Sequence, residues 1–518
     1  MRTDRYVVFK QSGTHSDSLT AIGAADLLRH IEPRLVDCGD RFEVRLARNL
    51  GILDLRAVEP GFAYLMRPKK HAPAVPPERI VRTGVSCITT AESRMYSILG
   101  RMKAYHGPNR LVSRYANLKR DEWEARICEC LHGGGRFVFQ SPLVQLFDPH
   151  GGRGYALLKP SGTDRRDRTK NRWARPFEQW LRFRGYFQGA AGWFAQGDLR
   201  LFTPIPFDIS YERLTKVAEQ FRDLRLGGVG SKIDCRAVLG FTRLLIESCR
   251  RKRRPREMVN GLWVTHYKDM GQTLAVIGMD QLALPNWMDL HTAEHAARWL
   301  SMLEEHDTVL RRLTDSHSDE LGLLKQYRAT FQMDRQDAIA AFLEFLAAYG
   351  PLIFRRRSHG HWSLPQLSLR SVSEILDASP ECRTILENPG VAAVTSAIRS
   401  ATFGAQGNRH RGDAAHREIR YGLFAELRRA SFVGNREMCT IVSEFIASFN
   451  AEGVRRRRSG LAASGITRAE IDAFGRALDG APDSILMGML LCGISSSHRG
   501  ESSSVERESE MVKVALPA

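Results

Sequence analysis

The spacing of apolar residues changes near residue 290, and this change limits the fold more than any other feature of the sequence. Before it, short apolar runs and alternating segments typical of strands lie between helical segments. After it, strand patterns nearly vanish, and amphipathic helical patterns follow one another to about residue 490. The sequence therefore predicts an α+β N-terminal domain followed by an all-α C-terminal helical bundle.

The first part of the chain shows both kinds of pattern. Residues 6–9 form a short apolar run, and Ser16 or Ser18 can cap a helix that continues to about residue 30, with Gly23 allowing close packing. Residues 41–48 alternate apolar and charged side chains, as a half-exposed strand does. Further on we expect a strand at 198–202, helices at 210–224 and 234–250, and a hairpin of strands at 262–266 and 273–279.

The second part is expected to be helical throughout. Helical patterns cover residues 293–305, 320–331, 335–349, 372–376 and then a bundle from 382 to about 490. We therefore predict four regions: an α+β domain at 1–285, a helical connecting region at 286–380, a basic helical bundle at 381–494 and a disordered tail at 495–518.

Basic residues are in excess and gather with aromatic ones. The chain has 76 Lys and Arg against 58 acidic residues, a net charge of +18, which favours a polyanionic partner. Between residues 164 and 184, eight basic residues against three acidic ones alternate with aromatic rings, which is typical of nucleic-acid contact or of a solvated face over a core. The residues of types suited to base edges or stacking are Lys170, Asn171, Arg172, Trp173, Gln188 and Trp193.

Two more basic clusters follow. Residues 250–256 contain six basic residues in seven and form either a solvated run or a phosphate clamp, of which we favour the clamp, with Arg250, Arg251, Lys252 and Arg253. In the bundle we expect three arginines, Arg417, Arg420 and Arg428, on one side of a single helix. The full set of candidate phosphate contacts there is Arg399, Arg409, Arg411, Arg417, Arg420, Arg428 and Arg429. The arginines at 455–458 extend this cationic face.

Catalytic interpretations are weaker. Cys128, Cys130, His132 and His150 could ligate zinc, but the cysteine spacing is not that of the usual zinc pairs. A second set, His291, His295, His306 and Asp307, could indicate a metal-dependent nuclease, although an ordinary cluster on solvent-exposed helices explains it more simply. We therefore expect a binding protein without catalytic residues, metal or cofactor. A metal-dependent nuclease and a stand-alone DNA-binding regulator remain the alternatives.

Location follows from the apolar segments and the cysteines. The longest apolar run, 485–494, is shorter than the roughly 18 residues of a spanning helix, and the N-terminus has no hydrophobic signal segment. Nine cysteines are scattered without a regular framework, which indicates reduced thiols. We expect a cytoplasmic protein without a membrane partner.

Three segments carry a resemblance to a known family. They are VFKQSG at 8–13 followed by an alanine-rich helix, GYFQGAAGWF with GDLRLFTPIPFDI at 185–209, and NPGVAAVTSAIRSAT with REIRYGLFAEL in the last third. In pattern and order the chain resembles the large subunits of type I CRISPR effector complexes, also called Cascade. The resemblance is scattered over most of the chain and includes no short invariant signature.

The resemblance implies a non-catalytic subunit of an RNA-guided surveillance complex. Its N-terminal domain would contact the 5′ end of the guide RNA and the backbone subunits, read the protospacer-adjacent motif on duplex DNA, and help to open the duplex. It would then recruit a helicase–nuclease or another effector. The bundle resembles the small subunits of such complexes and would hold the target or displaced strand. Base pairing would then read the sequence, which leaves the protein mainly phosphates to contact.

Overall fold

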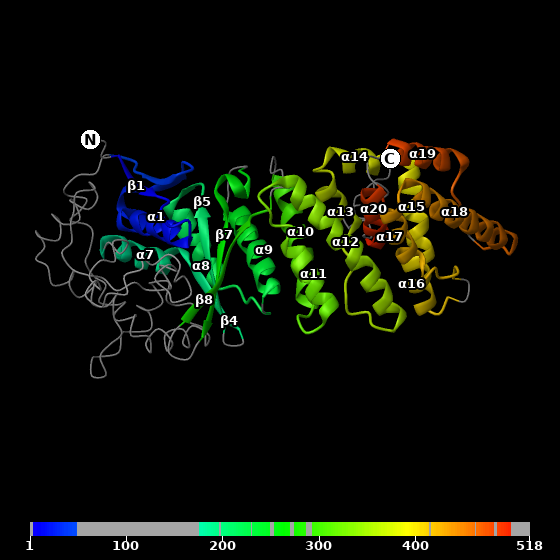
Figure 1. Ribbon diagram of the computed structural model, residues 1–518, viewed down its shortest axis with the longest axis horizontal. Helices are drawn as coiled ribbons and strands as arrows, with labels where there is room; N and C mark the ends of the chain where they lie inside the picture. Colours follow the sequence, from blue (N-terminus) through cyan, green and yellow to red (C-terminus); the bar gives the residue numbers. More distant parts are fainter. Residues whose placement is uncertain are drawn as a thin grey trace, which may run out of the picture. The chain divides into compact units, whose positions relative to one another are not determined.

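The computed structural model describes residues 4–48, 176–195, 198–228, 230–248, 253–269, 274–285, 293–413, 416–461, 463–480 and 484–498 (Figure 1). It divides into two compact units, Met1–Ala296 and Ala297–Ala518. The first unit contains two sheets with helices, and the described part of the second is built from helices. The predicted order of a mixed α and β part followed by a helical part is therefore confirmed at this level.

The first sheet, sheet A, is antiparallel with strand order β1 (Arg5–Phe9), β3 (Arg41–Arg45), β2 (Arg34–Asp37) and β6 (Asp208–Ser210). The alternation expected at 41–48 is confirmed over β3. Phe42 and Val44 are buried on the face that contacts α1 (His15–Leu27), and their charged neighbours point the other way.

Helix α1 is buried along its whole length. Its cap is Thr14, whose hydroxyl accepts a hydrogen bond from the Ser16 amide at 3.2 Å, so the expected caps at Ser16 and Ser18 are wrong. The backbone is extended at Thr14, and the helix therefore starts earlier than expected. The expected close packing at Gly23 is confirmed, because a Cβ there would lie 1.8 Å from the Leu181 carbonyl oxygen of α7 (Pro176–Gly189).

The second sheet, sheet B, is also antiparallel, with order β4 (Ala191–Ala195), β5 (Asp198–Pro206), β7 (Val259–Asp269) and β8 (Leu274–Ala283). The predicted hairpin is confirmed as β7 and β8. Helices α8 (Tyr211–Arg222) and α9 (Ser231–Ser248) contact strands β4 and β7 of this sheet, respectively.

The second unit collects its helices around α20 (Ser484–Ser496), which is apolar and buried over most of its length. Helices α12, α15 and α17 all contact it. The helices of this part are α10 (Ala293–Arg312), α11 (Ser318–Arg328), α12 (Arg335–Ser358), α13 (Leu369–Leu376), α14 (Pro380–Leu386), α15 (Pro389–Arg399), the π-helix η8 (Ser400–Gly404), α16 (Ala405–His410), α17 (Leu423–Val433), α18 (Asn435–Arg458) and α19 (Arg468–Gly480).

Two features of this unit bear on the sequence predictions. The expected start of a disordered tail at Ser495 is wrong, since Ser495 to Ser497 are buried and His498 forms a β-bridge with Ser368. The described part of the C-terminal end, to His498, therefore belongs to the core. Helix α12 is long and apolar enough to cross a membrane, but 67% of its most apolar window is buried inside the unit, as expected for a helix at the centre of a bundle.

Candidate nucleic-acid interface

Several predicted site residues lie outside the described residues. These are Lys170, Asn171, Arg172 and Trp173 of the opening basic and aromatic stretch, Arg250, Arg251 and Lys252 of the second cluster, the zinc candidates Cys128, Cys130, His132 and His150, and His291.

Trp193 is part of the core between sheet B and its helices. Its indole N–H donates to the Leu224 carbonyl at 3.2 Å, and its ring meets Phe202 and Phe221 edge to face at 5.4 and 5.1 Å. These contacts give the ring a packing role, because wedging into a duplex would require it to leave them. Gln188 lies half-buried near the end of α7, which packs on α1.

The part of the 250–256 cluster that the structure describes begins at Arg253, and its arginines form hydrogen bonds within the protein. Arg253 donates to the Asp208 carboxylate at 2.9 Å and to the Glu257 carbonyl at 2.8 Å. Arg256 donates to the Leu284 carbonyl at 2.5 Å, and burial lowers the pKa of Arg256 to about 10. These two arginines hold the ends of strands together, which differs from the predicted phosphate clamp.

The predicted arginine face of a single helix is wrong. Helix α17 begins at Leu423, so Arg417 and Arg420 precede it in irregular backbone, and only Arg428 is on the helix. The sequence around them has the period of a helix, but Gly422 and the turn before Leu423 interrupt it.

Arg417 is an internal residue. Its side chain is buried, with the guanidinium 4.0 Å from the centre of the Phe449 ring, and it donates to the Ser464 carbonyl at 2.8 Å. Glu452 is 3.7 Å away. Burial lowers the pKa of Arg417, and the charge of Glu452 opposes this shift.

Two further candidates are also engaged inside the helical unit. Arg399 donates to the Ile494 carbonyl at 2.7 Å, and Arg420 bonds the Ser448 hydroxyl. Together with Arg417, they join segments far apart in the sequence. Their charges are used to satisfy carbonyl and hydroxyl groups, so they contribute to stability more than to an external surface.

The exposed candidates lie elsewhere. Arg428 and Arg429 on α17 are exposed, as is Arg436 at the start of α18, across the turn at Gly434. Gly434 has φ 131°, a conformation that few other residues adopt. We call Arg428, Arg429 and Arg436 the corner arginines; within the described part of the chain, no carboxylate pairs with them.

Other exposed arginines of the unit are near polar side chains or at a helix end. Arg409 donates to the Tyr421 hydroxyl at 3.2 Å, and Arg411 to Asn408 at 2.5 Å. The last turn of α18 carries four arginines, where the negative end of the helix dipole favours cations; Arg455, Arg457 and Arg458 are exposed. This unit therefore presents cationic groups that can reach phosphates.

The described residues give no support to a metal site for the nuclease alternative. No group of three or more His, Cys, Asp or Glu side chains able to hold a metal ion occurs among the described residues. The expectation that His306 lies on a solvent-exposed helix is wrong, since it is buried and its Nδ1 is 2.7 Å from the Tyr327 hydroxyl. Burial lowers the pKa of His306 to about 4, and the charge of Glu305 opposes this shift. Asp307 pairs instead with Arg311.

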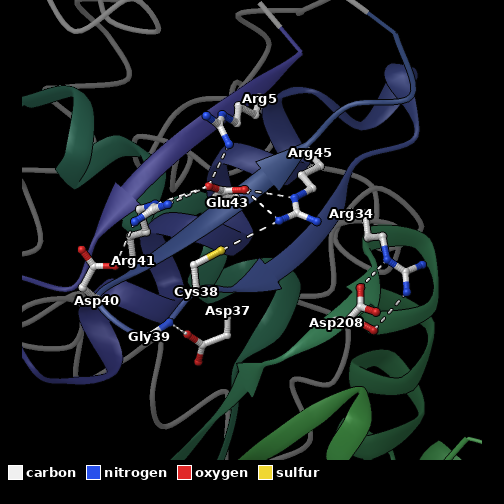
Figure 2. A network of polar contacts seen from close by, with 10 residues as sticks. All are labelled: Arg5, Arg34, Asp37, Cys38, Gly39, Asp40, Arg41, Glu43, Arg45 and Asp208. Carbon is white, nitrogen blue, oxygen red and sulfur yellow. Dashed lines mark hydrogen bonds and ion pairs between the residues drawn. The ribbon is translucent and has the colours of Figure 1, made fainter. Parts of the chain in front are cut away.

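Sheet A carries a charged cluster outside the sites predicted from the sequence. Figure 2 shows Arg5, Arg41 and Arg45 around the carboxylate of Glu43, at N–O distances of 3.0, 3.2 and 3.0 Å. Burial alone would raise the pKa of Glu43, but hydrogen bonds from Arg45 and Arg41 and the charge of Arg5 outweigh it, so the pKa is lowered. The signal was present in the sequence as R-x-E-x-R at 41–45, which places all three side chains on one face.

Asp208 forms a second charged contact of this sheet. Arg34 and Arg253 both bond its carboxylate, and Figure 2 shows the Arg34 contact. The hydrogen bond from Arg34 lowers the pKa of Asp208, an effect that burial partly opposes.

Comparison with known proteins assigns no family, because neither a protein-family model nor a curated protein matches this sequence.

Proposed function

We propose that the protein is a non-catalytic large subunit of a type I CRISPR RNA-guided surveillance complex. In this role it contacts the 5′ end of the guide RNA and the backbone subunits, recognises the protospacer-adjacent motif on double-stranded DNA, and helps to unwind the duplex. It then recruits a helicase–nuclease or another effector. It works in the cytoplasm, without a cofactor or a membrane partner.

The observation that carries the proposal is the division of the arginines in the helical unit. Arg399, Arg417 and Arg420 serve the interior, whereas the corner arginines point to solvent from α17 and α18. An exposed set of guanidiniums without carboxylate partners among the described residues suits a polyphosphate backbone. The net charge of +18 and the sequence resemblance support the same role.

The experiment is recovery of the tagged chain from its native host, with sequencing of the RNA and identification of the proteins that accompany it. We expect short RNAs of one length that carry a constant repeat fragment and a variable spacer, together with repeated backbone subunits. Recovery of the chain alone, or with bulk nucleic acid only, would contradict the proposal.

The two rival functions have their own readouts on the same purified material. A nuclease would cut DNA with Mg²⁺ or Mn²⁺ and lose that activity in His306→Ala. A stand-alone regulator would bind a fixed duplex sequence without RNA and without partner proteins. We expect neither behaviour.

A further inference from the structure

The two faces of sheet A differ in composition. Directly paired residues of antiparallel strands point to the same side, and the register pairs Arg5 with Arg45 and Phe9 with Arg41. Val8, Phe42, Val44 and Leu35 fill the opposite face, which packs on α1. We call the first of these faces the open face. Its charged and aromatic residues on β1, β2 and β3 are Arg5, Phe9, Arg34, Arg41, Glu43 and Arg45, and Val7 and Val36 lie on it beside Glu43.

The open face is accessible and aromatic as well as charged. Phe9 is 56% exposed, so its ring is open to solvent at the end of β1. The side chains of Arg5, Arg41 and Arg45 are 33, 36 and 52% exposed, while Glu43 beneath them is 2% exposed. Accessible guanidinium groups therefore stand over a buried carboxylate.

The charges of this cluster do not balance. Three guanidiniums share the Glu43 carboxylate, and Arg41 also pairs with Asp40 at 3.1 Å. The group of these three arginines with Glu43 and Asp40 therefore keeps an excess of one positive charge. Each guanidinium has about five N–H donors, and one carboxylate accepts only about four hydrogen bonds. Most donors therefore remain for another acceptor. Because Glu43 already fixes the three side chains, an anion that binds them has less side-chain entropy to remove.

The chemistry of this face fits a single-stranded nucleic acid. Guanidiniums pair with phosphates, and an exposed ring on a four-stranded antiparallel sheet offers a stacking surface for an unpaired base. Asp40, with its side chain 67% exposed beside Arg41, and Asp208 repel phosphate but can accept a hydrogen bond from a ribose 2′-hydroxyl. Acceptance of a hydrogen bond from the 2′-hydroxyl favours RNA over DNA, because DNA lacks that group.

We propose that the open face of sheet A binds single-stranded RNA, with phosphates on Arg5, Arg41 and Arg45 and a base stacked on Phe9. Glu43 is a positioning residue that orients the guanidiniums. This inference deepens the proposed function and rests on it for the identity of the RNA as a guide, because it names the surface that holds it.

The test uses the purified full-length chain and a single-stranded RNA of about ten nucleotides, within the usual site size for such proteins. RNA carrying 4-thiouridine is cross-linked by ultraviolet light, and the modified peptides are identified. We expect cross-links in the peptide that contains Phe9 and in the peptide of residues 41–45. Cross-links confined to the helical unit would overturn the proposal even if the chain binds RNA tightly.

The contribution of each side chain to RNA affinity is measured by fluorescence anisotropy titrations with the same RNA. Loss of one stacked base is worth about 1–3 kcal/mol, so Phe9→Ala should weaken this site about 5- to 150-fold. Arg41→Gln with Arg45→Gln removes two contacts and should lower the salt slope by about 1.4, at about 0.7 for each phosphate contact of a single strand. Arg5 remains in that variant to pair with Glu43.

Arg225→Gln is the matched control, since it removes an exposed arginine of the same unit that is not on sheet A. It should leave the cross-links and the salt slope unchanged. A diffuse charge effect would give Arg225→Gln about half the loss of the Arg41 and Arg45 variant, because it removes one charge instead of two; a loss of that size would overturn the proposal. DNA of the same sequence should bind with an affinity at least about threefold lower, because it lacks the 2′-hydroxyl. Equal binding would overturn the assignment to RNA.

Glu43→Gln separates a positioned cluster from a simple charge patch. It removes a negative charge from the face and so raises its net charge by one, from which general electrostatics predicts tighter binding. We expect binding about threefold or more weaker, because the guanidiniums lose their common anchor; tighter binding would contradict the positioning role. The outcome is separable from the proposed function. Cross-links on sheet A without guide RNA in the host pull-down would leave the RNA face standing and remove the effector complex, and the reverse result would remove only the face.

Discussion

Arg417 and Arg429 were equivalent candidates in the sequence, and the structure separates them. Arg417→Met removes the charge but keeps most of the apolar stem, and so does Arg429→Met. At Arg417 the change removes a buried cation over Phe449, a hydrogen bond to the Ser464 carbonyl and the partner of Glu452. The cation–π contact and the charged hydrogen bond together suggest a loss of about 2–4 kcal/mol of stability.

This loss of stability can be measured as a decrease in melting temperature. For a unit of 150–250 residues, each kcal/mol shifts the melting temperature by about 2–4 °C, so Arg417→Met should lower the melting of the helical unit by about 4–16 °C. Arg429→Met should change stability by no more than about 0.5 kcal/mol, because its side chain is exposed. Thermal unfolding followed by circular dichroism at the helical signal measures both.

The effects of the two variants on duplex DNA binding should be the reverse of their effects on stability. Arg429→Met should reduce the salt slope by about 0.9 if its guanidinium contacts one phosphate, whereas folded Arg417→Met should keep the wild-type slope. Anisotropy titrations at several salt concentrations, below the melting temperature of both variants, provide the comparison. A stable Arg417→Met protein that has lost a phosphate contact would refute the assignment of Arg417 to the interior.

The remaining predictions concern packing and pH. Gly23→Ala should destabilise the first unit by about 3 kcal/mol or more, because the new Cβ would overlap the Leu181 carbonyl, whereas Gly322→Ala, with open space around it, should stabilise its helix by up to about 1 kcal/mol; urea unfolding of the pair tests this, and equal effects would contradict it. The lowered pKa of Glu43 means that its contribution to stability is complete above its ordinary pKa of 4.5 and is lost as the pH falls through its folded-state value, so Glu43→Gln should flatten the acid limb of the first unit's unfolding. The pKa of His306 is lowered from 6.5 to about 4, so between these pH values the unfolded chain binds a proton that the folded chain does not. As the pH falls from 6.5 to 4, the helical unit should therefore lose up to about 3 kcal/mol of folding stability. Urea midpoints for wild type and His306→Gln measure this loss, and an identical pH dependence in the two would contradict it.

Local patterns in the sequence predicted the elements well. The alternation at 41–45 depends only on the period of a strand, and the hairpin of β7 and β8 on two apolar runs with a short polar link. Gly23 was recognisable as a close-packing position because glycine and alanine adjoin there in a helical pattern. Each of these signals lies within a few residues of the chain.

The partners of individual charges could not be predicted in this way. Arg417 bonds a carbonyl at Ser464, and His306 is buried against a tyrosine of the next helix, so both environments depend on tertiary packing. The helical period of 417–428 also failed, since a turn separates Arg420 from Leu423. The R-x-E-x-R pattern showed that three charges share a face, but only the neighbouring strand brings Arg5 to the same carboxylate.

The proposed function requires that this chain reads a short flanking motif for an RNA-guided complex. The most direct test compares duplex DNA binding by the RNA-loaded complex assembled with and without the chain, on targets that differ only in the bases flanking the complementary sequence. We expect tight binding next to one flanking motif, dependent on complementarity to the RNA, and loss of the motif dependence when the chain is omitted. Unchanged motif dependence without the chain, or recognition of one fixed duplex sequence by the chain alone, would contradict it.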